Sequence, residues 1–209
     1  MSSPPARRTQ EQRRAETRAK LLDATVSSVL EVGYAHTTTR RVAELAGVSA
    51  GAEAYHFPRR VDLVGAAVEH LAQRRIAEGR RRVTELPTAP HERLPAVLDL
   101  LWGDFSSPIF VVFVKLWVAA ADEPELYARL VTAERQIVRE ITKLAYEILG
   151  DLAARPRIER MLLLVLSACR GLALTEHFEP HDHRRRAQWP ALRAALLHAV
   201  SAEVAGSDV

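Results

Sequence analysis

The chain has 209 residues, 48% of them hydrophobic and 26% charged, which suits one globular body or a small domain joined to a larger one. Its single cysteine, Cys169, excludes an internal disulfide framework and suits a reducing compartment. The net charge is only +3, but basic residues outnumber acidic ones among the first 20 residues. Such an arm suits contact with DNA phosphates, although the first eight residues fit a solvated tail equally well.

The start of the chain is polar and rich in arginine, so we expect no signal peptide. The longest apolar run, Ile109 to Ala121, is interrupted by Lys115 and is too short to span a bilayer. We therefore expect a cytoplasmic protein without a membrane partner.

Helix signals begin near the amino end. Thr9 and Gln12 have the spacing of a capping box and predict the start of a first helix, which Gly33 should end. Residues 37–57 then indicate two short helices joined by a tight turn. A threonine among residues 37–39 should cap the first, and Gly47 should end it in a left-handed conformation. Ser49 should cap the second, which runs to about His56.

This pair of helices has the features of a helix-turn-helix. Val42, Leu45 and Ala46 form an apolar stripe at helical spacing, and Val48 is the apolar residue of the turn. A helix-turn-helix places its second helix in the major groove of DNA. An ordinary helical hairpin is the alternative interpretation.

The remaining segments are also predicted to be helical, without the alternating pattern of a strand. A fourth helix should begin at Pro58 and run to about Val83, where its arginines at 74, 75, 80, 81 and 82 suggest a solvated face. Later helices are expected at 90–105, 108–121, 124–149, from 156 and from 190. We thus predict an all-α fold of about nine helices. A proline-rich stretch places the domain boundary near residues 84–90.

Residues 17–68 resemble the N-terminal domain of the TetR/AcrR family of bacterial transcriptional regulators. The resemblance rests on Leu22, Ala24, Gly33, Tyr34, Thr37, Thr38, Val42, Ala43, Ala46, Gly47, Val48, Ser49, Gly51, Ala52, His56, Phe57, Pro58 and Leu63. It implies a helix-turn-helix domain over residues 9–60, a bridging helix at 58–83, and a helical regulatory and dimerisation domain over 84–209. Family members often carry Lys or Arg at the position of Ala50 and a large apolar residue near Glu53, so this chain departs from the family in its recognition helix.

Twelve residues are candidates for DNA contact. The side of the second helix expected to face DNA holds Ala50, Gly51, Glu53, Ala54 and Tyr55. Glu53 would accept from cytosine N4 or remain solvated without a base contact, and the alanines suit a thymine methyl group. The phosphate candidates are Thr37, Thr39, Arg40, Ser49, Tyr55, His56, Arg59 and Arg60.

A dimer is expected, because two recognition helices about 34 Å apart would read a palindromic operator. Leucines on the last two helices, Leu162, Leu166, Leu192 and Leu196, would either pair with a second copy or fill the core of one chain. The resembling family dimerises through these two helices.

The regulatory part concentrates aromatic residues, which are either plain core or the lining of a cavity for a small, mostly apolar effector. The ligand candidates are Trp102, Phe105, Phe110, Phe113, Trp117, Tyr146 and Arg170. Arg170 and Lys115 lie within apolar segments, so each should extend its charged end to water, pair with an acid, or meet an anionic ligand, and the candidate acids are Glu134, Glu176 and Glu179.

The segment that holds His177, Glu179, His181, Asp182 and His183 is interpreted as a polar loop, and we expect no metal or cofactor. The leading hypothesis is a ligand-responsive regulator, and the resemblance favours a repressor. The alternatives are an enzyme that uses a helical cavity, for which the sequence offers no nucleophile–base pair or phosphate loop, and a sequence-independent DNA-binding protein.

Overall fold

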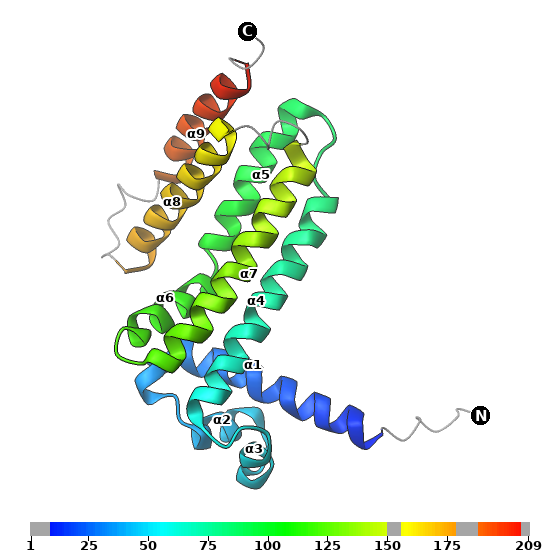
Figure 1. Cartoon of the computed structure of the whole chain (residues 1–209), viewed down its shortest axis with the longest axis vertical. Helices are drawn as coiled ribbons and strands as arrows, with labels where there is room; N and C mark the ends of the chain where they lie inside the picture. The colour runs from blue at the N-terminus through cyan, green and yellow to red at the C-terminus, as the bar shows by residue number, and fades with distance from the viewer. Residues whose placement is uncertain (1–8, 150–155, 179–187, 206–209) are drawn as a thin grey trace, which may run out of the picture. The chain divides into compact units, whose positions relative to one another are not determined.

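A computed structural model describes residues 9–149, 156–178 and 188–205 of the chain. Within these residues the chain forms nine α-helices and no strand, as predicted (Figure 1). The helices are α1 (Gln10–His36), α2 (Thr39–Ala46), α3 (Ala50–His56), α4 (Arg60–Thr84), α5 (Pro90–Phe105), α6 (Pro108–Ala120), α7 (Pro124–Leu149), α8 (Pro156–Phe178) and α9 (Gln188–Ala205).

Local capping explains where the first helices begin and bend. The Thr9 hydroxyl accepts from the Gln12 amide at 3.2 Å and the Gln12 side chain accepts from the Thr9 amide at 2.9 Å, which confirms the capping box. Gly33 has a φ of 78° and interrupts α1 before its last turn. Two later helices do not start at the predicted prolines. Helix α4 begins two residues after Pro58, and α9 begins two residues before Pro190.

The described residues form two compact units, and neither unit is one continuous stretch of chain. The first holds the residues up to Ala72 together with Val112–Glu134, and the second holds Gln73–Val111 and the residues from Arg135 onward. The helices α4, α6 and α7 therefore each contribute to both units. This grouping by contacts differs from the sequence-based boundary near 84–90, and the assignment of DNA-binding and regulatory roles to the two parts stays a prediction.

The core of the first unit joins α1 to the short helices. Leu21 and Leu22 of α1 are buried against Val42, Phe57 and Leu63. Val48 of the turn packs against this cluster, as expected for the residue between the two short helices. Leu45 does not follow the predicted apolar stripe, since it is exposed.

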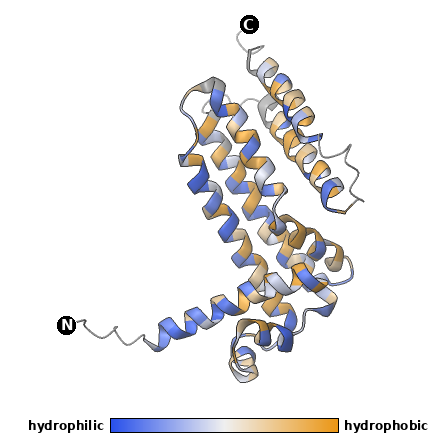
Figure 2. Cartoon of the chain, turned by 180° about the vertical axis from the view of Figure 1, so that it is seen from behind, coloured by the Kyte–Doolittle hydropathy of each residue, from blue (hydrophilic) through white to orange (hydrophobic). Residues whose placement is uncertain are grey.

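In the second unit α5 packs on α8 and α9. The Trp102 ring of α5 stacks on Trp189 of α9 with centroids 4.7 Å apart, and Asp99 accepts from Arg193 at 2.6 Å. Figure 2 shows hydrophobic residues along both α8 and α9. Only part of that apolar surface is covered within the described chain, because Leu163 and Leu164 are more than half exposed.

Candidate DNA-binding surface and small-molecule pocket

The helix-turn-helix forms as the sequence predicts. Thr38 is the threonine that caps α2, and its hydroxyl accepts from the Arg41 amide at 3.2 Å. Gly47 ends α2 with a φ of 64°, a conformation that glycine adopts without a Cβ clash. The Ser49 hydroxyl accepts from the Ala52 amide at 3.2 Å and starts α3. These three local interactions fix the turn that aims α3.

One side of α3 is open to solvent. We define the recognition face as Ala50, Gly51, Ala54 and Tyr55, which are all exposed. These four residues are grouped because positions four apart lie on the same side of a helix. Tyr55 is 66% exposed and has the Arg14 guanidinium over its ring at 5.0 Å, which places a basic residue of α1 beside this face. Small side chains and one aromatic ring thus form a surface that a groove wall can approach closely.

Glu53 does not belong to the recognition face, so the prediction that it faces outward is wrong. Its residue is only 4% exposed, and burial raises the pKa of its carboxyl. One carboxyl oxygen, Oε1, is buried without a hydrogen-bond partner. The reason is its spacing, because Glu53 precedes the buried Phe57 by four residues and therefore points to the same inner side. A base contact from Glu53 is excluded by this placement.

The phosphate candidates on α2 and at its start divide into open and closed positions. Arg40 is exposed, with one surface pair to Glu44 at 3.0 Å, and Ser49 is exposed as well. Thr39 is half-buried. Thr37 is fully buried, its hydroxyl donates to the Gly33 carbonyl at 2.8 Å, and it lies 3.0 Å from the Ser28 hydroxyl. Thr37, which lies between α1 and α2, is therefore held against α1, and its prediction as a phosphate contact is wrong.

Arg59 and Arg60 are occupied by partners in the first unit. The Arg59 guanidinium donates to Asp62 at 2.9 Å and lies 3.2 Å from Glu125, although the side chain stays largely exposed. Arg60 lies over the Tyr34 ring at 4.2 Å and 3.5 Å from Glu123. These contacts connect Arg60 at the start of α4 to α1, and its role in holding the DNA backbone stays a prediction.

His56, the last residue of α3, is half-buried. Burial lowers the pKa of its imidazole, and the nearby charges of Arg14 and Arg18 lower it further. The ring is therefore neutral at pH 7, which weakens the predicted attraction to phosphate. The neighbourhood of Arg14 and Arg18 to α3 is not predicted by local spacing in the sequence. Arg18 lies over the Phe57 ring at 5.5 Å, and the basic composition of residues 1–20 was the available signal.

The second unit holds a pocket of about 540 Å³. Its wall comes from the later turns of α4, from α5 and from α7, with Ile109 and Leu162 added. Most of it is aliphatic, through Val83, Leu86, Val97, Leu100, Leu101, Ile137, Ile141, Leu144 and Ile148. This volume and lining are typical of sites for small organic molecules.

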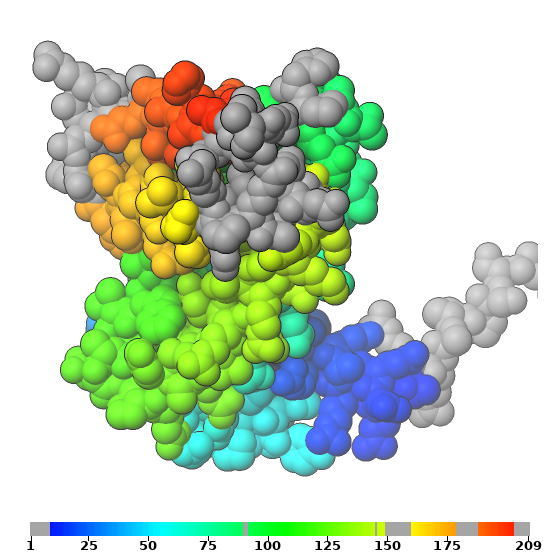
Figure 3. Space-filling view, turned by 45° about the horizontal axis from the view of Figure 1, so that its top comes forward, coloured from blue at the N-terminus to red at the C-terminus, as the bar shows by residue number. Residues whose placement is uncertain are grey.

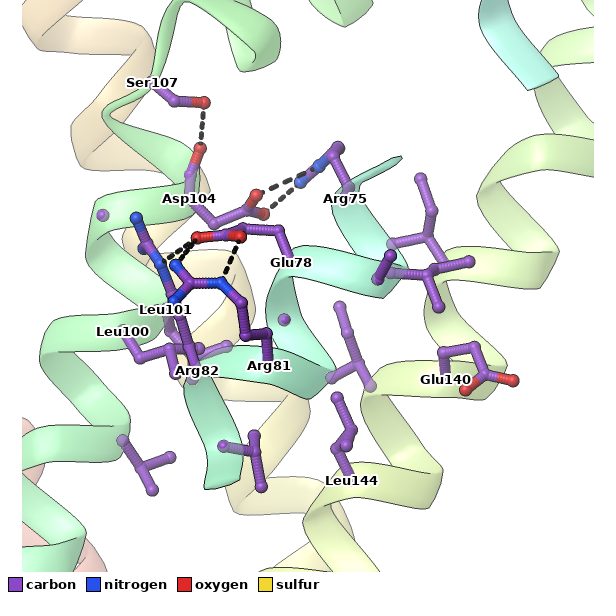
Figure 4. Close-up of a pocket in the computed structure, with 18 of the residues that line it drawn as sticks. Arg75, Glu78, Arg81, Arg82, Leu100, Leu101, Asp104, Ser107, Glu140 and Leu144 are labelled. Atoms are coloured by element: carbon purple, nitrogen blue, oxygen red, sulfur yellow. Dashed lines mark hydrogen bonds and ion pairs between the residues drawn. The ribbon is translucent and has the colours of Figure 1, made fainter. Parts of the chain in front are cut away.

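Ion pairs form the polar part of the pocket wall (Figure 4). Arg75 pairs with Asp104, with Nε 3.1 Å from Oδ1. The carboxylate of Glu78 accepts from Arg81 at 2.8 Å and from Arg82 at 2.9 Å, and these hydrogen bonds lower the pKa of Glu78 to about 2. The predicted solvated arginine face is wrong for Arg75, whose side chain is only 10% exposed.

None of the seven predicted ligand residues lines this pocket. Their positions are as follows: Trp102 stacks on Trp189, Phe105 and Phe110 pack edge to face, Phe113 is buried, Trp117 packs against Tyr127, and Tyr146 and Arg170 are exposed. The aromatic rings serve mainly in helix packing, while aliphatic residues of the same helices line the pocket. The cation predicted to need an acid, Lys115, instead donates to the backbone carbonyl of Leu30.

Two further candidate groups are a cysteine on α8 and the histidine-rich segment at the end of that helix. Cys169 is buried, and burial raises the pKa of its thiol to about 11, so it stays protonated at pH 7. Of the metal-like segment, only His177 is described, and residues 179–187 lie outside the described residues. Among the described residues, no group of three His, Cys, Asp or Glu side chains is placed to hold a metal ion.

Comparison with known proteins supports the resemblance seen in the sequence. The sequence model described as "Bacterial regulatory proteins, tetR family" matches residues 21–67. An uncharacterised HTH-type transcriptional regulator of Mycobacterium tuberculosis is 30% identical over 190 residues, which covers 90% of this chain and 97% of the relative.

Solved structures show the same fold. A TetR-family transcriptional regulator from Rhodococcus sp. covers 90% of this chain and 97% of its own, with 23% identity and a TM-score of 0.65. The multidrug binding protein EbrR, complexed with imidazole, covers 87% of this chain and 93% of its own, with 20% identity and a TM-score of 0.59. From the helix-turn-helix geometry and the near-complete match to a regulator, this chain belongs to the TetR family of bacterial transcriptional regulators.

Proposed function

We propose that this TetR-family regulator binds a palindromic operator as a homodimer, represses transcription there, and is released by a small, mostly apolar effector. The observation that carries the DNA-binding part is the exposed recognition face on α3, held by the Ser49 cap and the Gly47 turn. Its relatives are transcriptional regulators, so the chain is a regulator and not an enzyme. Its place of action is then the bacterial cytoplasm.

The recognition face suits apolar readout. The methyl groups of Ala50 and Ala54 fit against thymine methyl groups, and the missing side chain of Gly51 lets the helix approach the groove closely. Tyr55 reaches sugar or phosphate beside them. Arg40 and the Ser49 hydroxyl hold the DNA backbone, a role that positions the protein but does not select the sequence.

The proposed dimer interface is the open side of α8 and α9, whose atoms lie side by side in Figure 3. Leu163, Leu164, Leu174 and Phe178 of α8 are exposed in the single chain. The segment Arg160–Phe178 is also long and apolar enough to cross a membrane, but helices buried inside proteins meet the same criterion. We infer that a second copy covers this face, because reading a palindrome requires two recognition helices.

The proposed effector site is the pocket of the second unit. Its volume of about 540 Å³ and aliphatic wall fit a small apolar molecule, and EbrR, which has the same fold, is a multidrug binding protein. Helix α4 is one continuous helix that carries Leu63 of the first core and, further along, the pocket-lining residues from Arg74 to Val83. A ligand that favours one position of α4 would shift the population between DNA-competent and released arrangements.

Selection of bound fragments from the host genome tests this function. We expect one enriched palindromic motif, and competition with random DNA should leave its binding intact at physiological salt. Equal binding to random DNA would indicate the sequence-independent alternative. Candidate effectors are then added to the selected complex. Failure of every compound that fills the pocket to release the DNA would contradict the effector part of the proposal.

A further inference from the structure

The charge balance of the pocket wall bears on which effector it takes. The described wall contains three carboxylates, Glu78, Asp104 and Glu140. Each already accepts hydrogen bonds from arginine. Arg75 donates to Asp104, Arg80 donates to Glu140, and Arg81 and Arg82 donate to Glu78. A cationic ligand would therefore have to compete with a guanidinium that already neutralises each carboxylate. The wall is therefore poorly suited to a cation.

Arg82 is in the opposite situation. Its Nε donates to Glu78 Oε1 at 2.9 Å, and the same oxygen accepts from Arg81 at 2.8 Å. Arg81 has a second acid, Glu85, at 2.7 Å. Among the described residues, the terminal nitrogens of Arg82 make no further hydrogen bond. Two guanidiniums thus share one carboxylate, and Arg82 keeps the donors that match a carboxylate in a two-point contact.

The position of Arg82 makes those donors accessible from the pocket. Its side chain is 45% exposed and lines the wall together with Gly103 of α5. A Cβ built on Gly103 would lie 3.4 Å from Arg82 Nη1, so the guanidinium reaches across to α5 where that helix has no side chain. Leu100, Leu101 and Leu144 provide apolar wall in the same pocket (Figure 4).

We propose that the pocket takes a molecule with an aliphatic body and a single carboxylate, and that Arg82 binds the carboxylate. The aliphatic wall suits the aliphatic body of the effector. The terminal nitrogens of Arg82 are available for the carboxylate because Arg82 shares Glu78 with Arg81. This inference rests on the proposed role of the pocket as the effector site and adds the charge of the effector to it.

The test compares three ten-carbon probes that differ only in the head group. Decanoate, 1-decanol and decylamine are titrated into the full chain by calorimetry at pH 7.5 and low salt, each below its micelle-forming concentration. A charge-assisted hydrogen bond to arginine predicts that decanoate binds roughly ten- to a hundredfold more tightly than decanol. Decylamine should bind more weakly than decanol. Binding of decanol or decylamine that is as tight as binding of decanoate, or tighter, would overturn the proposal.

Variants locate the effect. Arg82→Gln should bring the affinity for decanoate close to that for decanol. Arg82→Met, which keeps a long side chain but no charge, should have the same effect and replaces the glutamine variant if that variant folds poorly. Arg139→Gln removes the same charge from α7 at a position outside this pocket wall and should leave the preference unchanged. A full preference in the Arg82 variants would refute the assignment.

A variant whose pocket is filled by a larger side chain distinguishes failure of the carboxylate assignment from failure of the proposed effector site. Leu144→Trp should abolish binding of decanoate and decanol together. If both probes bind this variant as they bind the parent, or if no probe binds the parent, the pocket is not the effector site and both proposals fail. If filling blocks both probes but decanoate shows no advantage, only the carboxylate assignment fails.

Discussion

Replacing Glu53 should stabilise the protein, which is unusual for a substitution in the middle of a helix-turn-helix. Glu53 is 4% exposed and its Oε1 has no partner, so the folded state leaves a buried acceptor unsatisfied. An unsatisfied buried polar group costs about 1–3 kcal/mol. Glu53→Leu removes that cost and places an apolar side chain beside Phe57, so we expect the free energy of unfolding to rise by about that amount.

The expected change is measurable by thermal unfolding followed by circular dichroism. For a chain of this length 1 kcal/mol corresponds to about 2–4 °C in Tm, which predicts an increase of several degrees. Glu44→Leu is the matched control, because Glu44 is exposed on α2 and engages only a surface pair with Arg40. That control should change stability by no more than about 0.5 kcal/mol.

The pH dependence gives a second readout. The folded-state pKa of Glu53 is raised above its ordinary value of 4.5, because burial disfavours the charged form. Its favourable contribution is therefore fully present below the unfolded-state pKa and is lost as the pH rises through the folded-state pKa. The advantage of Glu53→Gln over the parent should be larger at pH 7.5 than near pH 4.5. A lower Tm for Glu53→Leu, or an altered operator motif, would refute the placement of Glu53 on the inner side.

Three further predictions address the turn, the phosphate contact and the dimer. Gly47→Ala should lower stability by about 1–2 kcal/mol in a urea titration, because φ at this position is 64°, whereas Gly79→Ala on α4, where the added Cβ meets only Leu144 at 3.9 Å, should not destabilise the protein. Arg40→Ala should weaken binding to all DNA sequences and reduce the salt slope by about one unit, and an unchanged slope in a salt titration would remove Arg40 from the phosphate contacts. Leu163→Glu combined with Leu164→Glu should convert a dimer to a monomer in sedimentation velocity without detergent, and a dimer that persists would place the interface elsewhere.

Local sequence signals predicted the start of α1 and the helix-turn-helix well, because each of these features depends on neighbours a few residues apart. The Thr9 capping box, the left-handed Gly47 and the Ser49 cap are all contacts within four residues, and each was readable from spacing. The inward position of Glu53 was readable in the same way from its distance to Phe57. The family pattern, which has an apolar residue near this position, pointed to the same answer.

The pocket could not be predicted because its wall is built by long-range packing. Residues of α4, α5 and α7 that are up to about 70 positions apart form one lining, and no spacing rule connects them. The aromatic residues did not indicate where the pocket lies, because Trp102 of α5 stacks on Trp189 of α9 and so packs one helix against another. The arginines of α4 were judged from their own helix alone, while the burial of Arg75 depends on Asp104 of α5.

Operator binding by a variant of the recognition face tests the central claim most directly. Ala50→Glu places a carboxylate on the exposed side of α3 without touching the core, and fluorescence anisotropy on the selected operator reports its effect. We predict a loss of affinity of at least about a hundredfold, because a negative charge would face the groove, with an unchanged Tm. Operator affinity equal to that of the parent would contradict the assignment of α3 as the DNA-reading helix.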